Sequence, residues 1–133
     1  MKTRFLMSFV VTGILVLVSP GGKTRAAGDD IGYNNQGITY YQKGDYDRAI
    51  RDFTKAIEIN PRYAKAYNYR GSAYGEKGDY DQAIRDFTKA IEINPKNSNA
   101  YAGRSWVWGK KGDYDKANAD WAKAQELSGR EEK

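Results

Sequence analysis

Pairs of carboxylates are the residues of this sequence whose type and spacing best suit chemistry. They recur at one point of a repeated phrase, KGDYD, as Asp45/Asp47, Asp79/Asp81 and Asp113/Asp115. Two neighbouring carboxylates can act in acid–base catalysis or ligate a metal when a cleft perturbs them. The chain has no histidine and no cysteine, so it lacks the usual nucleophile–base pairs and most transition-metal ligands. We therefore interpret these aspartates as helix caps and first-turn charges, and we expect no catalytic residue, cofactor or metal.

The phrase belongs to a longer repeat with a period of 34 residues. KGDYDRAIRDFTKAIEINP begins at Lys43, returns at Lys77 with one substitution, and begins a third time at Lys111 with a rewritten ending. The spacing is kept by Tyr33, Tyr67 and Tyr101, by Tyr40, Tyr74 and Trp108, by Ala49, Ala83 and Ala117, by Phe53, Phe87 and Trp121, and by Ala56, Ala90 and Ala124. Within the first copy, Tyr33 and Tyr40 are seven residues apart, and Ala49, Phe53 and Ala56 are four and three residues apart. Each group therefore lies on one face of a helix, and each copy encodes two amphipathic helices.

This pattern resembles the tetratricopeptide repeat family, in which an aromatic residue, Gly and Tyr are followed by Ala, an aromatic residue, Ala and Pro. The matching positions of the second copy are Tyr67, Gly71, Tyr74, Ala83, Phe87, Ala90 and Pro95. Gln36, Arg70 and Arg104 stand where the family usually has Leu, which makes that face more polar. The resemblance implies an all-α helical-repeat solenoid of three helix-turn-helix units, stacked as a short right-handed superhelix with one concave face.

The turn residues predict where each helix begins and ends. Gly44, Gly78 and Gly112 suit the left-handed residue that closes a helix, and the following Asp is a good cap for the next helix. Pro61 and Pro95 end the second helices. We expect helices over about 30–43, 46–59, 64–77, 80–93, 98–111 and 114–127, in repeats spanning 30–63, 64–97 and 98–129, with a polar tail over 130–133.

The first 27 residues have the layout of a secretory signal peptide. Lys2 and Arg4 precede an uncharged apolar stretch from Phe5 to Val18 and a Pro/Gly turn. The stretch is shorter than the roughly 20 apolar residues of a membrane-spanning helix, so we expect export to the periplasm or the medium, with an uncleaved anchor as the alternative. Contact with a membrane would then be transient.

Net charge gives no reason to expect nucleic acid as a partner. The formal charge is +5, but four basic residues and no acidic ones lie in the leader, which leaves 18 Lys and Arg against 17 Asp and Glu. A nearly neutral mature chain does not recruit a polyanion through its overall field.

The third copy is rewritten where one repeat should meet the next. Ile50 and Ile57, like Ile84 and Ile91, lie on second helices, but the third copy has Asn118 and Gln125 instead. Burying isoleucine stabilises by about 1.5–3 kcal/mol, whereas burying an unpaired amide costs about 1–3 kcal/mol. We expect the solenoid to end here without a separate capping helix.

The resemblance implies that the first helix of each repeat lines the concave groove. The candidates for peptide contact are then Asn34, Ile38 and Tyr41, then Lys65, Asn68, Tyr69 and Ser72, then Trp106 and Lys110, with Ile31, Gln42, Glu76, Asn99 and Ala102 beside them. Asn34 and Asn68 can hydrogen-bond a peptide backbone. Trp106 either faces the groove as a binding aromatic or packs on the second repeat, and the sequence leaves both open.

Members of the family that grip a chaperone's C-terminal carboxylate use Lys and Asn on the first groove helix, Asn on the second, and Lys and Arg on the third. This chain has Asn34 and Ile38, then Tyr69, then Asn99 and Gly103 at those places. The clamp is absent, so we do not expect that partner.

Together these features predict an exported, non-catalytic module, monomeric or weakly self-associating, that binds a peptide or helix of another protein in its groove. Two alternatives stay open: a structural, self-associating role in an envelope assembly, and an accessory subunit of an enzyme. The identity of the partner is not encoded in the fold, because specificity lies in a few groove side chains.

Overall fold

The computed structural model describes residues 10–11, 14–15 and 28–131, and these contain six helices and two short strands. The helices are α1 (Asp29–Gln42), α2 (Tyr46–Ile59), α3 (Ala64–Glu76), α4 (Tyr80–Ile93), α5 (Ser98–Lys111) and α6 (Tyr114–Glu131). Strands β1 (Val10–Val11) and β2 (Ile14–Leu15) pair antiparallel, with Val10 opposite Leu15. The rest of the predicted signal peptide lies outside the described residues. None of the described helices is long and apolar enough to cross a membrane.

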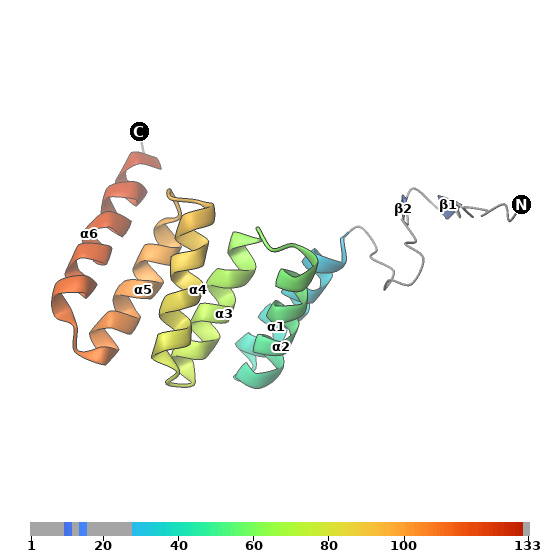
Figure 1. The fold of residues 1–133 in the computed structure, drawn as a ribbon, viewed down its shortest axis with the longest axis horizontal. Helices are drawn as coiled ribbons and strands as arrows, with labels where there is room; N and C mark the ends of the chain where they lie inside the picture. Colours follow the sequence, from blue (N-terminus) through green and yellow to red (C-terminus); the bar gives the residue numbers. More distant parts are fainter. Residues whose placement is uncertain (1–9, 12–13, 16–27, 132–133) are drawn as a thin grey trace, which may run out of the picture.

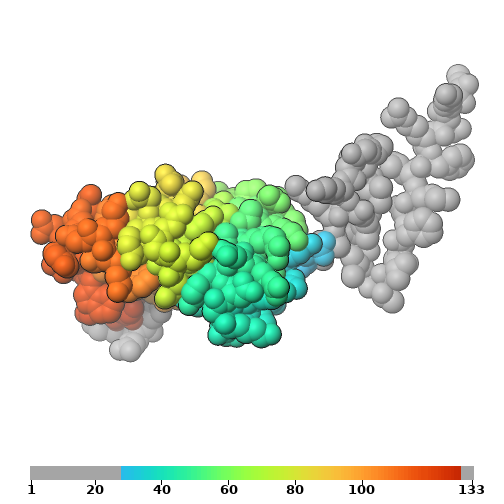
Figure 2. Space-filling view, turned by 90° about the horizontal axis from the view of Figure 1, so that it is seen from below, coloured from blue at the N-terminus to red at the C-terminus, as the bar shows by residue number. Residues whose placement is uncertain are grey.

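The helices stand side by side in chain order, in one row from α1 to α6 (Figure 1). The space-filling view shows the same order as consecutive blocks of colour across the surface (Figure 2). Each helix packs on its chain neighbours; across repeats, α1 also contacts α3 and α3 contacts α5, whereas α2, α4 and α6 make no such contacts with one another. The first helices of the repeats (α1, α3 and α5) are therefore closer together than the second helices (α2, α4 and α6). The first helices thus form the concave side of the row. The right-handed sense of the superhelix stays a prediction.

The KGDYD turns close the first helices as the sequence predicts. Gly44, Gly78 and Gly112 have φ values of 77°, 83° and 83°, the left-handed region that favours glycine. The aspartate after each of these glycines donates its backbone N–H to a carbonyl in the last turn of the preceding helix. In the second repeat, for example, Asp79 donates to the Tyr74 carbonyl at 2.9 Å. The second helices end at Ile59 and Ile93, two residues before each proline, so the predicted ends are confirmed.

Aromatic rings of the second helices fill the space beside glycines of the first helices. Phe53 and Phe87 are almost completely buried. A Cβ added to Gly37 would lie 2.6 Å from Cε1 of Phe53, and one added to Gly103 would lie 2.4 Å from Cε1 of Phe87. The main core cluster joins the second and third repeats: Tyr67, Ala83, Phe87, Ala90, Ala100 and Val107. The predicted close approach of paired helices is thus a ring-on-glycine contact, which lies within the first repeat at Gly37 and joins the second repeat to the third at Gly103.

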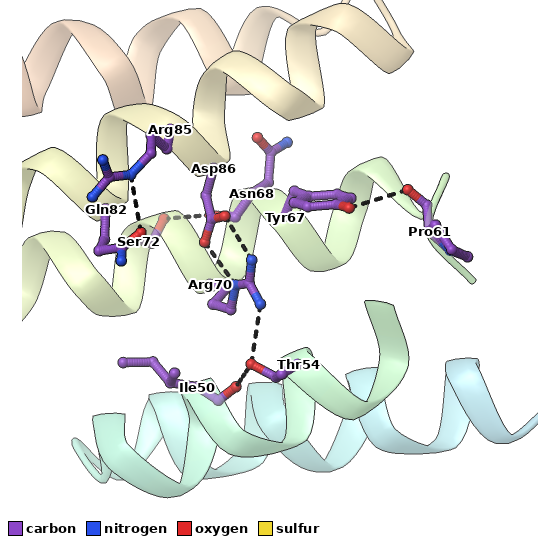
Figure 3. A network of polar contacts seen from close by, with 10 residues as sticks. All are labelled: Ile50, Thr54, Pro61, Tyr67, Asn68, Arg70, Ser72, Gln82, Arg85 and Asp86. Carbon is purple, nitrogen blue, oxygen red and sulfur yellow. Dashed lines mark hydrogen bonds and ion pairs between the residues drawn. The ribbon is translucent and has the colours of Figure 1, made fainter. Parts of the chain in front are cut away.

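Arg70 ties three helices together (Figure 3). Its Nε and Nη2 donate to the two carboxylate oxygens of Asp86 on α4, at 2.7 and 2.8 Å, and its Nη1 donates to Oγ1 of Thr54 on α2 at 3.1 Å. Arg104 repeats these bonds with Asp120 and Thr88 at the same distances. We call each set an arginine bracket. At Arg70 and Arg104 the sequence predicts a more polar face, but the structure makes these arginines interior links between consecutive repeats.

The charge of Asp86 stabilises the charged form of Arg70 although both side chains are largely buried. Burial by itself would lower the pKa of Arg70, but the hydrogen bonds and charge of Asp86 outweigh it and raise that pKa. Arg70 and Asp86 have side chains only 17% and 7% exposed, so removing either partner would leave a buried charge uncompensated.

At both ends of the row, positions that are buried between neighbouring repeats are exposed, as the rewritten third copy predicts for one of them. Asn118 and Gln125 are exposed, whereas Ile84 and Ile91 pack against the core cluster. At the other end Gly32 and Thr39 of α1 are exposed, at the positions where α3 has the buried residues Ala66 and Ala73. One expectation is wrong: α6 does not end near residue 127 but continues to Glu131, because Gly129 replaces the proline that ends α2 and α4.

Candidate functional site

A groove of about 850 Å³ follows α3 toward the start of α5. It is lined by Ala64, Lys65, Asn68, Tyr69 and Ser72 of α3, by Phe87, by Asn94, Lys96 and Asn97 of the α4–α5 connection, by Ser98 and Asn99, and by Ser128 of α6. We call it the α3–α5 groove. A second hollow of about 420 Å³ adjoins it, because Ser98, Asn99 and Ser128 line both, and Trp121 forms its far wall.

Helical spacing brings the α3 side chains together. Lys65, Asn68 and Ser72 follow one another at three and four residues, which places them on one face. The Ser72 hydroxyl donates to the Asn68 carbonyl at 3.1 Å (Figure 3). The side-chain Oδ1 of Asn68 is buried and has no hydrogen-bond partner among the described residues. An acceptor in the groove wall is therefore unpaired, which is unusual for a buried polar atom.

The charge of the α3–α5 groove is positive. Lys65 and Lys96 are exposed along it, and no aspartate or glutamate of the described part of the chain lines it. The remaining polar lining residues are asparagines and serines, which can donate and accept. The groove thus favours a ligand that offers backbone hydrogen bonds and negative charge.

The structure brings together four of the nine predicted contact residues: Lys65, Asn68, Tyr69 and Ser72 line the groove. Asn34 occupies the position of Asn68 in the first repeat, but it is completely buried and lies outside the α3–α5 groove. Its Nδ2 and Oδ1 have no hydrogen-bond partner among the described residues. The expectation that Asn34 faces a ligand is therefore wrong in this conformation, because the side chain is enclosed by its surroundings.

Ile38 and Tyr41 are half-buried on α1, and Tyr41 lies at one end of a run of aromatic rings. The Tyr41 ring centroid lies 6.3 Å from that of Tyr69, and the Tyr69 ring stacks on Phe53 at 5.7 Å. Burial raises the pKa of Tyr41, and the nearby charge of Glu76 raises it further, so the hydroxyl stays a neutral donor. These contacts hold Tyr69 rigidly in the groove wall.

Trp106 combines the two alternatives that the sequence left open. Its ring packs on α3 so closely that a Cβ on Gly75 would lie 2.5 Å from Trp106 Cζ3. The residue nevertheless remains 39% exposed, and the Lys110 ammonium lies 5.8 Å from its ring centroid. Trp106 and Lys110 extend the face of α5 that begins with Asn99 and Ala102. Their contact with a partner stays a prediction.

Sequence reasoning missed the α4–α5 connection and the end of α6. Asn94, Lys96, Asn97 and Ser128 line the groove, although none lies on a predicted contact helix face. One signal was present: the connection reads NPKNSNA where the previous repeat reads NPRYAKA, in otherwise nearly identical copies. Residues that differ between otherwise nearly identical repeats are not required by the shared fold, so they are candidates for a role in binding.

The carboxylate pairs take the structural roles expected of them, with one exception. Asp45 and Asp113 accept the backbone N–H of the residue three positions on, each at 3.2 Å. Asp79 stands at the same cap position but makes no such side-chain bond. Asp47 pairs with Lys77, and Asp81 with Lys111. Across the described residues no group of three or more acidic side chains is placed to hold a metal ion.

Three helical pairs with their first helices on the concave side define a helical-repeat solenoid. The comparison with protein families names it: the family described as tetratricopeptide repeat matches residues 64–97, and the one described as TPR repeat matches residues 37–78. The chain is a tetratricopeptide repeat protein, and its six helices make about three tandem repeats.

Solved structures show the same architecture. MamA superposes with a TM-score of 0.73 at 29% identity, over 77% of this chain and 60% of that chain. The second TPR of Spaghetti (RPAP3), bound to the HSP90 peptide SRMEEVD, gives 0.72 at 27% identity, over 74% and 92%. The Arabidopsis OM64 TPR domain gives 0.75 at 29% identity, over 77% and 84%. This chain thus spans about three fifths of the length of MamA. No curated protein matches it.

Proposed function

We propose that this chain is a protein-interaction module that holds an extended segment of a partner protein in the α3–α5 groove, without catalysis or a cofactor. The observation that carries the proposal is the buried, unpaired Oδ1 of Asn68 in the groove wall. An extended peptide presents backbone N–H groups that such an acceptor can receive. The RPAP3 domain, which holds a peptide in its structure, supports this use of the fold.

The groove chemistry narrows the partner. Lys65 and Lys96 favour a segment with acidic residues, and the asparagines and serines recognise backbone more than particular side chains. The HSP90 peptide is not proposed as the ligand, because Ile38, Tyr69 and Gly103 replace residues of the carboxylate clamp. Trp106 and Lys110 are expected to contact the same segment where it continues along α5.

Selection from a library of random extended peptides tests this function. We expect enriched sequences to be acidic and to bind the folded chain, and Asn68→Ala to weaken binding roughly five- to tenfold, the worth of one hydrogen bond. Asn118→Ala is the matched control, because Asn118 is exposed on α6 away from the groove. Circular dichroism should show both variants folded. Failure to enrich any peptide, or equal binding by both variants, would refute the proposal.

A self-associating structural role is the second candidate, and exposed aromatic residues at the end of the row favour it. Tyr114 is 69% exposed and Trp121 is 53% exposed, both on α6. Large exposed aromatics often belong to interfaces. Light scattering separates the two functions: a monomer at all concentrations favours the groove, whereas a dimer that Trp121→Ala dissociates favours self-association.

Export remains part of the proposed function. The basic start at Lys2 and Arg4, the apolar stretch and the Pro/Gly turn support a cleaved signal peptide and an exported module. Fractionation of cells that produce the full chain, with mass spectrometry of its N-terminus, tests this. Recovery of the uncleaved chain in the membrane fraction would favour the anchor instead.

A further inference from the structure

The first repeat keeps only half of an arginine bracket. Asp52, Asp86 and Asp120 occupy one position of the three repeats and are 5%, 5% and 7% exposed. Asp86 and Asp120 each receive two hydrogen bonds from an arginine. The position of that arginine is Gln36 in the first repeat, and Oδ2 of Asp52 has no hydrogen-bond partner among the described residues. A buried carboxylate oxygen without a partner is costly, so a donor that reached Asp52 would stabilise this end of the row.

The ring beside the missing guanidinium is also retained. In the complete brackets the guanidinium carbon of the arginine lies 5.6 Å from the Tyr67 ring centroid, or 5.7 Å from that of Tyr101. The equivalent Tyr33 is present, and the ammonium of Lys55 lies 5.1 Å from its centroid. Lys55 makes no ion pair with Asp52 in the described part of the chain. The first repeat thus still attracts a cation, but nothing supplies a guanidinium to Asp52.

The position is also open on the side where the other brackets are closed. Arg70 is covered by α2, which contributes Thr54, as Figure 3 shows. Among the described elements α1 packs only on α2 and α3, so no preceding helix lies over Gln36, which is exposed. A guanidinium can reach this end of the row from outside.

We propose that Asp52, with Tyr33 beside it, is a receptor for one arginine side chain at the N-terminal end of the solenoid. The two complete brackets define its chemistry: two parallel N–H donors to the carboxylate, a geometry that arginine offers and lysine does not. The guanidinium is that of a partner protein, because the described part of the chain supplies none to Asp52 and no described helix covers this end of the row. The receptor is separate from the α3–α5 groove and does not depend on the function proposed for it.

The first experiment measures whether Asp52 is an unfilled guanidinium receptor. Thermal unfolding of the chain is compared with that of Gln36→Arg, each with Asp52 and with Asp52→Asn. If Asp52 is the receptor, Gln36→Arg completes the bracket, raises the melting temperature by several degrees when Asp52 is present, and has no effect in the Asp52→Asn chain. Gln36→Lys is the matched control for the gain of one positive charge, and we expect it to change little, because lysine does not offer two parallel donors.

The second experiment measures whether an outside arginine binds. The peptide acetyl-Gly-Arg-Gly-amide is titrated into the 15N-labelled chain, and the lysine peptide of the same length is the control. We expect saturable shifts of the Asp52 and Tyr33 amide signals, about tenfold weaker binding of the lysine peptide, and no binding to the Gln36→Arg chain, whose own side chain fills the site.

The proposal is overturned if Gln36→Arg leaves the melting temperature unchanged and the arginine peptide shifts neither amide signal. It is overturned equally if binding survives in Asp52→Asn, because the carboxylate would then not be the receptor.

Discussion

Single glycines decide how closely the first and second helices of this protein approach. Gly37, Gly71 and Gly103 face phenylalanine rings, and Gly75 faces the ring of Trp106. At Gly103 a Cβ would lie 2.4 Å from a core ring that is only 2% exposed, so no flexible side chain can move aside. Glycine is therefore present at these positions because no larger side chain fits there, and not because the backbone needs to be flexible.

Gly103→Ala should destabilise the protein although alanine is the better helix former. We expect a loss of about 1–3 kcal/mol in the free energy of unfolding, since overpacking outweighs the propensity gain of about 1 kcal/mol. Gly109→Ala on the same helix is the matched control, because nothing lies within 4 Å of its added Cβ. It should stabilise by up to about 1 kcal/mol. Urea unfolding of the two variants measures this, and an equal response of both would contradict the packing argument.

At the scale of elements, an ion pair links each turn region to the next repeat. Lys77 at the end of α3 pairs with Asp47 at the start of α2, and Lys111 at the end of α5 pairs with Asp81 on α4 at 2.5 Å. A hydrogen bond and the charge of Lys111 lower the pKa of Asp81. A lowered carboxyl pKa contributes stability above the pKa of the unfolded chain, and this stability is lost as the pH falls through the folded value.

Lys111→Met should raise the pKa of Asp81 back toward the ordinary aspartate value. An NMR titration of the Asp81 carboxyl carbon measures its midpoint, and Lys110→Met is the control, because the Lys110 ammonium lies near Trp106 instead. The stability change should be small, since the pair is exposed and screened by salt. A midpoint that both variants shift equally would mean that general charge, and not this pair, depresses the pKa.

At the scale of the whole molecule, the repeats stabilise one another unequally. The main core cluster joins the second repeat to the third, with Phe87 against Gly103 and with Ala100 and Val107 buried behind it. The first repeat adds Ile57 to the edge of this cluster. A repeat cannot bury its own apolar face, so stability depends on which neighbours are present.

Removing the third repeat should therefore cost more than removing the first. A chain that ends at residue 97 loses Ala100 and Val107, two of the six buried cluster residues, and uncovers Phe87, so we expect it to show no cooperative thermal transition. A chain that begins at residue 60 keeps the cluster and should unfold cooperatively at a lowered melting temperature. Circular dichroism melts of both chains decide the point, and the reverse order of stability would show that the core lies elsewhere.

Most of the fold was predictable because its causes are local and repeated three times. Left-handed glycines, prolines after the second helices and the aromatic and alanine periodicity each act within a few residues, so the helix bounds agree within one residue except at the end of α6. The polar end at Asn118 and Gln125 was predictable too, because the copies could be compared with one another.

The site was predictable only in part, because repeat position does not fix environment. Asn34 and Asn68 share one position, yet Asn34 is enclosed and Asn68 lines a groove with an unpaired oxygen. The α4–α5 connection and Ser128 reach the same groove from separate segments, which no single helix face could reveal.

The sequence by itself determined the repeat and its turns, because these follow from short-range sterics and from apolar residues at helical spacing. Only the tertiary structure decided that Arg70 and Arg104 are buried links, that Trp106 both packs and remains exposed, and that Asp52 lacks its arginine. The physical reason is that burial and pairing depend on which helices meet, and residues 16 or 30 positions apart come into contact only once the repeats have stacked.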